Sequence, residues 1–420
     1  MNPSRKGPPL TVSSGSEGYR LSRNLEYLKP SETVSINQET QRRRAAGEDV
    51  IDLSAGEPDF ETPKLVSEAG IRAIQQGKTK YPPNAGILDL RAAVARHLSL
   101  LSGGRPVNAD HVVVSTGAKQ SLFNACMALF GPGDRVLIPS PAWVSYPQIV
   151  RLARAEPVMV EGAIEWSLKV DVDALEAAWD HRVAGLILCS PVNPTGAVYS
   201  RAEIKAIAEW ARAKNVWLIA DEIYRRIHYG SGPAPSVLDL PDELLTRVMV
   251  IYGASKAYAM TGWRIGVAIA PLPIAKVMAA LQTHVTSGAC HPAQWAAAAA
   301  FGDERVEVAV AEMVEAFRRR RDLVVGHFRE HLSGVEFIEP LGAFYFFFRV
   351  DSYLNDELAT AAAFCERLMA EQGVALVPGD AFGDPRWVRL SYAASERDLT
   401  RALERITRFA RKLESVRAGR

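Results

Sequence analysis

The sequence predicts an α/β protein with a mostly parallel sheet covered by helices on both faces, followed by a smaller α+β domain. Short apolar segments alternate with helical patterns through the middle of the 420-residue chain. This alternation is typical of parallel strands joined by crossover helices. After a long helical pattern at 305–332, the strands become more closely spaced, which indicates the second domain. With 48% hydrophobic residues, the chain can bury more than one core.

The large domain is expected to begin its sheet with the apolar segment 112–115, followed by a glycine-bearing turn and a helix that ends at Leu129. A helix is also expected over 201–214. Further strands are expected at 134–139, 185–190, 216–220, 248–252 and 265–270.

The smaller domain is expected to contain a helix at 358–372, a last helix near the C-terminus, and strands at 335–338, 344–350 and 388–391. The segment 51–53 resembles a lone strand with no partner nearby in the sequence. We therefore expect the N-terminal part to pack with this domain.

Composition and charge exclude several classes of protein. The formal net charge of +1 gives no general attraction to nucleic acid or to a membrane surface. No apolar run reaches the roughly 20 residues that span a bilayer. The four cysteines form no close pair, so no zinc or redox motif is indicated, and buried thiols in a reducing cytoplasm are expected. Residues 1–20 lack the apolar core of a signal peptide and are expected to be disordered.

Polar side chains follow three of the predicted strands, where ligands of such sheets collect. Asn193, Asp221 and Lys256 come just after the segments ending at 190, 220 and 252. Burial lowers the pKa of a lysine and makes it a better nucleophile. Such a lysine forms Schiff bases with carbonyl groups, and pyridoxal phosphate is the common aldehyde cofactor.

The other polar residues near these strand ends fit the same cofactor. A buried Asp221 needs a partner such as a protonated pyridine nitrogen, although an aspartate alone could equally cap a helix. Asn193 and Tyr224 are suited to bond a phenolate oxygen, with a turn asparagine and a core tyrosine as the alternatives.

An anion site is indicated where the segment 112–115 enters the next helix. Gly117 and Ala118 would offer free backbone N–H groups at the helix N-terminus, and Ser255 and Arg264 could hold the same phosphate. Lys119 opposes the helix dipole, which a nearby anion would explain, although an exposed lysine competes as an explanation.

Eight motifs resemble those of the fold-type I pyridoxal-phosphate aminotransferases, in particular the bacterial aspartate and aspartate/prephenate aminotransferase subgroup. They extend over most of the region 21–409 and lie at 55–60, 80–81, 141–147, 193–196, 221–224, 256–266, 342–345 and 388–392. The resemblance implies a large domain at 61–324 with a mostly parallel seven-stranded sheet. It also implies a small domain at 325–420, to which the arm at 21–60 contributes.

The resemblance implies a role for each cofactor-site residue. Lys256 would hold pyridoxal phosphate covalently and later move the substrate Cα proton. Asp221 would pair with the ring nitrogen, Asn193 and Tyr224 would bond the ring oxygen, and Trp143 would stack on the ring unless it is a core tryptophan. The phosphate would contact Gly117, Ala118, Ser255, Arg264 and, from the second subunit of a homodimer, Tyr81.

The resemblance also implies a dicarboxylate substrate. Arg389 would grip the α-carboxylate with help from the Gly56 N–H, beside Asn193 and Trp143. A surface ion pair is the alternative for Arg389. Three residues would reach the distal carboxylate: Lys119, Ser31 and Thr33.

The predicted reaction is ping-pong transamination of L-aspartate with 2-oxoglutarate in the cytoplasm, giving oxaloacetate and L-glutamate. Prephenate amination and a carbon–sulfur lyase of the same fold remain alternatives. A nicotinamide dehydrogenase is disfavoured because no Gly-x-Gly-x-x-Gly turn follows a strand. A non-catalytic regulatory protein is disfavoured because the N-terminal extension has no helix-turn-helix pattern.

Overall fold

The computed structural model describes residues 22, 25, 32–355 and 358–418 and confirms the predicted α/β class. Its large sheet has seven strands in the order β2-β8-β7-β6-β5-β3-β4. Strand β8 is antiparallel to both neighbours, and the other pairs are parallel. The strands are β2 (Val112–Thr116), β3 (Arg135–Ser140), β4 (Glu156–Glu161), β5 (Val183–Cys189), β6 (Trp217–Asp221), β7 (Val248–Gly253) and β8 (Ile265–Ile269).

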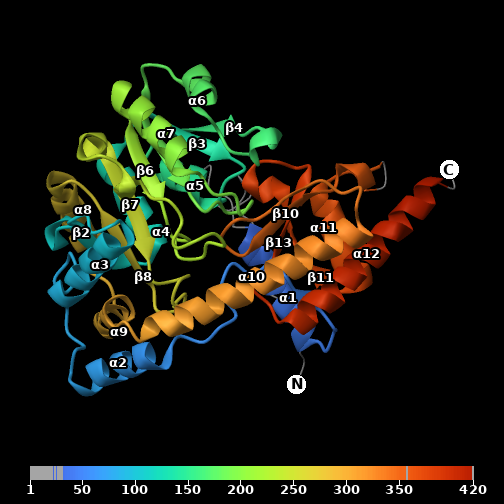
Figure 1. The fold of residues 1–420 in the computed structure, drawn as a ribbon, viewed down its shortest axis with the longest axis horizontal. Coiled ribbons are helices and arrows are strands. Elements are labelled where there is room, and N and C mark those ends of the chain that lie inside the picture. Colours follow the sequence, from blue (N-terminus) through green and yellow to red (C-terminus); the bar gives the residue numbers. More distant parts are fainter. Residues whose placement is uncertain (1–21, 23–24, 26–31, 356–357, 419–420) are drawn as a thin grey trace.

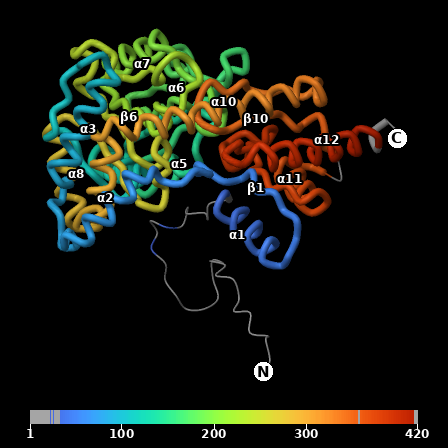
Figure 2. The backbone as a smooth tube through the Cα atoms, turned by 60° about the horizontal axis from the view of Figure 1, so that its bottom comes forward, coloured from blue at the N-terminus to red at the C-terminus, as the bar shows by residue number. Residues whose placement is uncertain are grey.

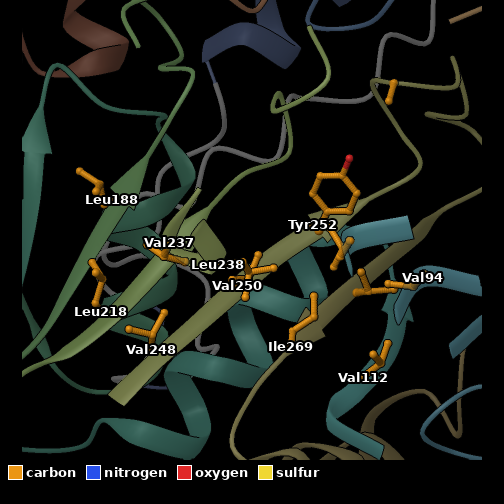
Figure 3. Close-up of a cluster of buried hydrophobic side chains, with 14 of the residues drawn as sticks. Val94, Val112, Leu188, Leu218, Val237, Leu238, Val248, Val250, Tyr252 and Ile269 are labelled. Atoms are coloured by element: carbon orange, nitrogen blue, oxygen red, sulfur yellow. The ribbon is translucent and has the colours of Figure 1, made fainter. Parts of the chain in front are cut away.

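Helices cover both faces of this sheet because successive strand residues point to opposite sides. Leu186 and Leu188 pack into one core with α3 (Leu88–Leu101), α7 (Arg201–Ala213) and α9 (His291–Gly302). Figure 3 shows part of this core, with Leu188, Leu218, Val248 and Val250 projecting from adjacent strands. The intervening Ile187 packs into a second core on the opposite face, with α4 (Ala118–Leu129), α5 (Ser145–Leu152) and α8 (Leu272–Val285).

The small domain is built on an antiparallel sheet in the order β12-β13-β10-β9. The third core of the molecule lies in this domain and joins the sheet to the helices beside it in Figure 1. The elements are α10 (Val306–His331), β9 (Phe337–Ile338), β10 (Tyr345–Arg349), α11 (Ala361–Gln372), β12 (Val377–Pro378), β13 (Trp387–Ser391) and α12 (Glu396–Ala418).

The N-terminal part packs on the small domain, as the sequence predicts. Strand β1 (Ile51–Asp52) pairs in parallel with β11 (Val374–Ala375). Figure 2 shows the chain leaving α1 (Glu32–Ala45), passing through β1, and crossing to α2 (Lys64–Gln75) beside the large domain. The proposed division at 324 lies within α10, which runs continuously along both domains (Figure 1).

Several features differ from the expectations. Strand β4, an edge strand whose residues are mostly not buried, was not predicted, and neither were the helices α1 and α6 (Val172–Ala178). The two-residue strands β11 and β12 are too short to leave a pattern. The expectation that the thiols are buried is wrong for Cys290, which is exposed because it stands just before the first turn of α9. The predicted extension at 1–20 lies outside the described residues.

Within the described ranges, no helix is long and apolar enough to cross a bilayer. The His, Cys, Asp and Glu side chains of the same ranges form no group of three or more that could hold a metal ion.

Candidate active site

A cavity of about 390 Å³ lies at the carboxyl ends of β5, β6 and β7, where residues of both domains meet. Parallel strands bring their carboxyl ends to one edge, so the strand-end residues converge there. Most of the predicted site residues line it: Thr33, Gly56, Ala118, Lys119, Trp143, Asn193, Asp221, Tyr224, Ser255, Lys256, Arg264 and Arg389.

Lys256 follows the end of β7 and projects into this cavity. Its ammonium group donates a hydrogen bond to the backbone carbonyl of Gly56. Burial lowers the pKa of Lys256 to about 8, although the Glu57 carboxylate acts in the opposite direction. A substantial fraction of the amine is therefore neutral near physiological pH, as a nucleophile or general base requires.

Asp221 is the last residue of β6 and is buried. The Tyr146 hydroxyl donates to Oδ2 at 2.7 Å, and the Ile223 N–H donates to Oδ1 at 3.2 Å. Burial raises the pKa of Asp221, whereas these two hydrogen bonds and the charge of Lys256 lower it. The chain turns after Asp221, so this residue does not cap an α-helix. Its carboxylate is held at a fixed place on the cavity wall.

Tyr224 and Asn193 are both buried and already hydrogen-bonded to other site residues. The hydroxyls of Tyr224 and Tyr345 lie 2.7 Å apart. Asn193 Oδ1 accepts a hydrogen bond from Arg389 Nη1 at 3.0 Å. Because the carbonyl oxygen of Asn193 is engaged in this way, its amide NH₂ is the group that can donate to a ligand oxygen.

A cradle for an anion forms at the N-terminus of α4. Gly117 has φ +81°, and a Cβ there would lie 2.4 Å from Nη2 of Arg264, so the guanidinium packs directly on the turn. A Cβ on Gly266 of β8 would lie 2.0 Å from the Ala118 nitrogen. These two glycines therefore let the helix start, the strand and the arginine approach closely. Ser255 is buried in the lining of the same cavity.

Arg389 projects from the middle of β13 and is only 2% exposed, which excludes a surface ion pair. Its two terminal nitrogens donate to neutral oxygens, Asn193 Oδ1 and the Ser54 carbonyl, the latter at 2.8 Å. Its Nε is buried without a hydrogen-bond partner among the described residues. Burial lowers the pKa of this guanidinium. A buried cation with an open donor fits a ligand carboxylate.

Lys119 and Trp143 form another part of the wall. The Lys119 ammonium lies 4.9 Å from the centre of a Trp143 ring. Burial lowers the pKa of Lys119, and the charge of Arg264 lowers it further. Thr33 lines the same cavity from α1. Ser31, predicted beside it, lies outside the described residues.

Two predicted cofactor residues are not in the cavity lining. Gly117 stands immediately before Ala118, behind the Arg264 guanidinium. Tyr81 is 87% exposed and does not line the cavity of its own chain. A role for Tyr81 at this kind of site therefore requires a second copy of the chain.

Several residues that line the cavity were not predicted from the sequence. Tyr146 and Tyr345 belong to the predicted motifs at 141–147 and 342–345 but received no role. Val34 and Asn37 lie on the same side of α1 as Thr33, because residues three and four apart share a helix face. The remaining missed residues are Ser54, Ala55, Glu57, Cys189, Ile223 and Thr261.

The donor set fits pyridoxal phosphate. The cavity holds an amine of lowered pKa for the aldehyde, a buried carboxylate for the ring nitrogen, and an arginine packed on a helix N-terminus for the phosphate. Asn193 and Tyr224 add donors suited to the ring oxygen.

Comparisons with known proteins identify the family of this chain. The chain is 42% identical to the aspartate/prephenate aminotransferase of Thermus thermophilus, with 92% of this chain and 98% of that protein covered. It is 44% identical to a bifunctional aspartate aminotransferase and glutamate/aspartate-prephenate aminotransferase of Petunia hybrida, covering 92% and 82%. A solved structure of the Thermus thermophilus aspartate aminotransferase with maleate matches at a TM-score of 0.87 and 39% identity, covering 93% and 100%. Residues 48–406 match the aminotransferase class I and II family, to which this chain belongs.

Proposed function

We propose that this protein catalyses the pyridoxal-phosphate-dependent transamination of L-aspartate with 2-oxoglutarate, giving oxaloacetate and L-glutamate by a ping-pong mechanism. The observation that carries the substrate class is the presence of Arg389 and Lys119 in the cavity that also holds Lys256, in addition to Arg264, the cation assigned to the phosphate. Two cations suit the two carboxylates of aspartate, glutamate and their oxo acids. The names of the two relatives above include aspartate, which supports the proposed donor.

Lys256, Asp221 and Tyr224 are the proposed catalytic residues. Pyridoxal phosphate, when bound, supplies the aldehyde that takes the amino group and the ring that withdraws electrons from Cα. The neutral amine of Lys256 would take up the substrate Cα proton and hold it for return within the same half-reaction. Asp221 would accept a hydrogen bond from the protonated ring nitrogen, and Tyr224 and Asn193 would donate to the ring oxygen. Trp143 covers the ring face.

The remaining roles concern binding. Ser255, Arg264 and the Ala118 backbone N–H would hold the phosphate. The predicted contact from the Gly117 N–H is not supported, because this group donates to the Ser115 carbonyl at 2.8 Å and Gly117 shapes the turn instead. Arg389 binds the substrate α-carboxylate as a two-pronged donor, with the Gly56 N–H beside it. Lys119 and Thr33, with Ser31, contact the distal carboxylate.

The working unit in this proposal is a cytoplasmic homodimer with shared active sites. Tyr81 of the second subunit would contact the phosphate. Large apolar side chains near Tyr81 in the chain support an interface there, since Ile71, Ile74 and Leu88 are each more than half exposed. We retain the division into a large domain at 61–324 and a small domain at 325–420 with the arm at 21–60.

Prephenate is the second proposed amino acceptor. It is also a dicarboxylate, so Lys119 and Arg389 would meet both of its charges. The names of the Petunia and Thermus relatives include this activity. A carbon–sulfur lyase is less well supported. Lys119 is suited to bind a second carboxylate, and the reaction of such a lyase does not require its substrate to have one.

A panel of amino donors tests the proposal. Purified protein showing the absorbance of bound cofactor is assayed with 2-oxoglutarate, oxaloacetate and prephenate as acceptors. Aspartate and glutamate should be the preferred donors by kcat/KM. Preference for neutral donors would contradict the dicarboxylate site, and release of pyruvate and ammonia without an acceptor would indicate a lyase.

A further inference from the structure

Tyr345 lies where the two domains meet at the cavity, and none of the roles above involves it. It is the first residue of β10 in the small domain and is 1% exposed. Its hydroxyl contacts the hydroxyl of Tyr224, which comes from the large domain. Its ring faces Arg389, whose guanidinium carbon lies 4.4 Å from the ring centre. One side chain thus contacts both a cofactor-site residue and a substrate-site residue.

We propose that Tyr345 is a positioning residue with two separable parts: its hydroxyl orients the Tyr224 proton toward the cofactor ring, and its ring holds Arg389 for the substrate carboxylate. This inference rests on the proposed function of the same cavity.

Only one direction of the hydrogen bond between the Tyr224 and Tyr345 hydroxyls lets Tyr224 donate to the cofactor. A hydroxyl carries a single proton, so Tyr224 can donate to the cofactor oxygen only if Tyr345 donates to Tyr224. Burial raises the pKa of both hydroxyls, and that of Tyr224 lies well above its ordinary value, so both keep their protons. A hydroxyl that accepts one hydrogen bond also becomes a stronger donor in the next.

The ring acts on Arg389 in a different way. The Arg389 guanidinium lies over the rings of Tyr345 and Phe382, at 4.4 and 4.9 Å from their centres. These aromatic faces replace part of the water that a buried cation loses. With the hydrogen bonds to Asn193 and Ser54, they orient the fork so that its remaining donors face a ligand.

Two substitutions separate these parts. Tyr345→Phe removes the hydroxyl and keeps the ring, whereas Tyr345→Leu removes both. Tyr392→Phe is the matched control, because Tyr392 is also buried and its hydroxyl pairs with another tyrosine, Tyr229, at 3.0 Å. Tyr392 does not line the cavity.

The first measurement is the pH midpoint of the visible absorbance change of the cofactor-loaded protein. The proton that titrates lies on the nitrogen through which Lys256 would hold the cofactor. Negative charge on the nearby ring oxygen attracts this proton, and a hydrogen-bond donor to that oxygen weakens the attraction. Tyr345→Phe should therefore raise the midpoint by about half a unit, roughly a threefold change in proton affinity, whereas Tyr392→Phe should leave it unchanged. On a Tyr224→Phe background, Tyr345→Phe should add no shift, since it acts through Tyr224.

The second measurement is the affinity for maleate, a dicarboxylate that cannot be transaminated. Tyr345→Phe should change the maleate Kd less than about twofold. Tyr345→Leu should weaken binding about tenfold, because Arg389 loses the nearer of its two aromatic neighbours and keeps only Phe382. Thermal unfolding checks that each variant is folded.

Equal midpoints in Tyr345→Phe and wild type, or an additive shift on the Tyr224→Phe background, would overturn the role of the hydroxyl. Equal maleate affinities in the Phe and Leu variants would overturn the role of the ring. Wild-type protein that shows the absorbance midpoint and binds maleate but does not transaminate aspartate would contradict the proposed function alone.

Discussion

The two sides of the cavity differ in how completely their side chains are paired. On the side formed by the carboxyl ends of β5, β6 and β7, called the sheet side, three functional groups already have protein partners: Asp221 with Tyr146, Tyr224 with Tyr345, and Lys256 with the Gly56 carbonyl. The other side is formed by Arg389 of β13 and by Lys119 at the N-terminus of α4. Arg389 bonds Asn193 and Ser54 but keeps a buried Nε without a partner among the described residues, and Lys119 faces a Trp143 ring.

This difference indicates that the sheet side is pre-organised and that the other side is completed by a ligand. Fixed dipoles and charges need little rearrangement when a reaction begins, so they suit the groups that act on the cofactor. An unpaired buried donor stabilises little until an anion arrives, so it suits selection of the substrate. Substitutions on the sheet side should therefore lower kcat, and those on the other side should mainly raise KM.

The largest effect is expected for Lys256→Ala. Loss of the amine removes both the covalent attachment and the proton carrier, so kcat should fall by at least about 10⁴-fold. The fold should survive, as measured by circular dichroism and thermal unfolding. Lys205→Ala is the control, since this lysine pairs with Glu209 on the surface of α7 and should keep full activity. Full activity of Lys256→Ala would refute the mechanism.

Arg389→Lys should have the next largest effect and a different signature. The charge remains, but the planar fork that bonds Asn193 and Ser54 is lost. The KM for aspartate should rise about 100-fold, with a smaller change in kcat. Arg386→Lys, at a surface pair with Asp384, should leave KM unchanged. A fall in kcat at constant KM would show instead that Arg389 acts like the pre-organised groups of the sheet side.

The pKa of Lys256 gives a pH-dependent prediction for cofactor capture by the apoprotein. Burial lowers this pKa from 10.5 to about 8, so the neutral, reactive amine should become the major form above that pH. The rate of pyridoxal phosphate incorporation should rise about tenfold between pH 7 and 9 and then level off. A rate that keeps rising beyond pH 10 would indicate an ordinary, solvated lysine.

Tyr146→Phe should lower kcat about tenfold, because a hydrogen bond to a buried carboxylate is removed. The Tyr146 hydroxyl favours the ionised form of Asp221, so its loss should raise the pKa of that carboxyl further. The acidic limb of the kcat profile should accordingly move to higher pH, and the KM for aspartate should stay nearly constant. A pure KM effect would contradict the pre-organised role of the sheet side.

The meeting of Asn193, Asp221 and Lys256 in one cavity could be predicted from the sequence because the geometry of parallel strands is regular. Asn193, Asp221 and Lys256 each follow an apolar segment, and parallel strands bring such positions to one edge. Arg389 was recognisable as a lone arginine within an apolar strand. Their partners were not predictable in this way. A tyrosine such as Tyr146 or Tyr345 fits a hydrophobic core equally well, and its hydroxyl partner depends on packing between distant segments.

The other unpredicted parts have different causes. Helix α1 was not predicted, because its sequence is polar nearly all round and carries no clear apolar stripe. Strand β4 lies at the sheet edge with few buried residues, so the continuous apolar run of a central strand is missing. The role of Tyr81 across subunits follows only from the family resemblance and stays a prediction, because the pattern of one chain carries no information about a second.

Lys119→Ala should give the smallest effect and the most selective one. The KM for aspartate should rise about fivefold, while the KM for an aromatic donor should stay within about twofold, because a partly exposed cation contributes modestly to binding a single charge. Both values come from the same steady-state assays with 2-oxoglutarate. Lys119→Arg, which keeps the charge, should restore most of the aspartate affinity. If the KM values for both amino donors rise equally, Lys119 acts on the phosphate site beside Arg264 rather than on the distal carboxylate. Lys119 would then belong with the groups that act on the cofactor, and Arg389 alone would distinguish the substrate side of the cavity.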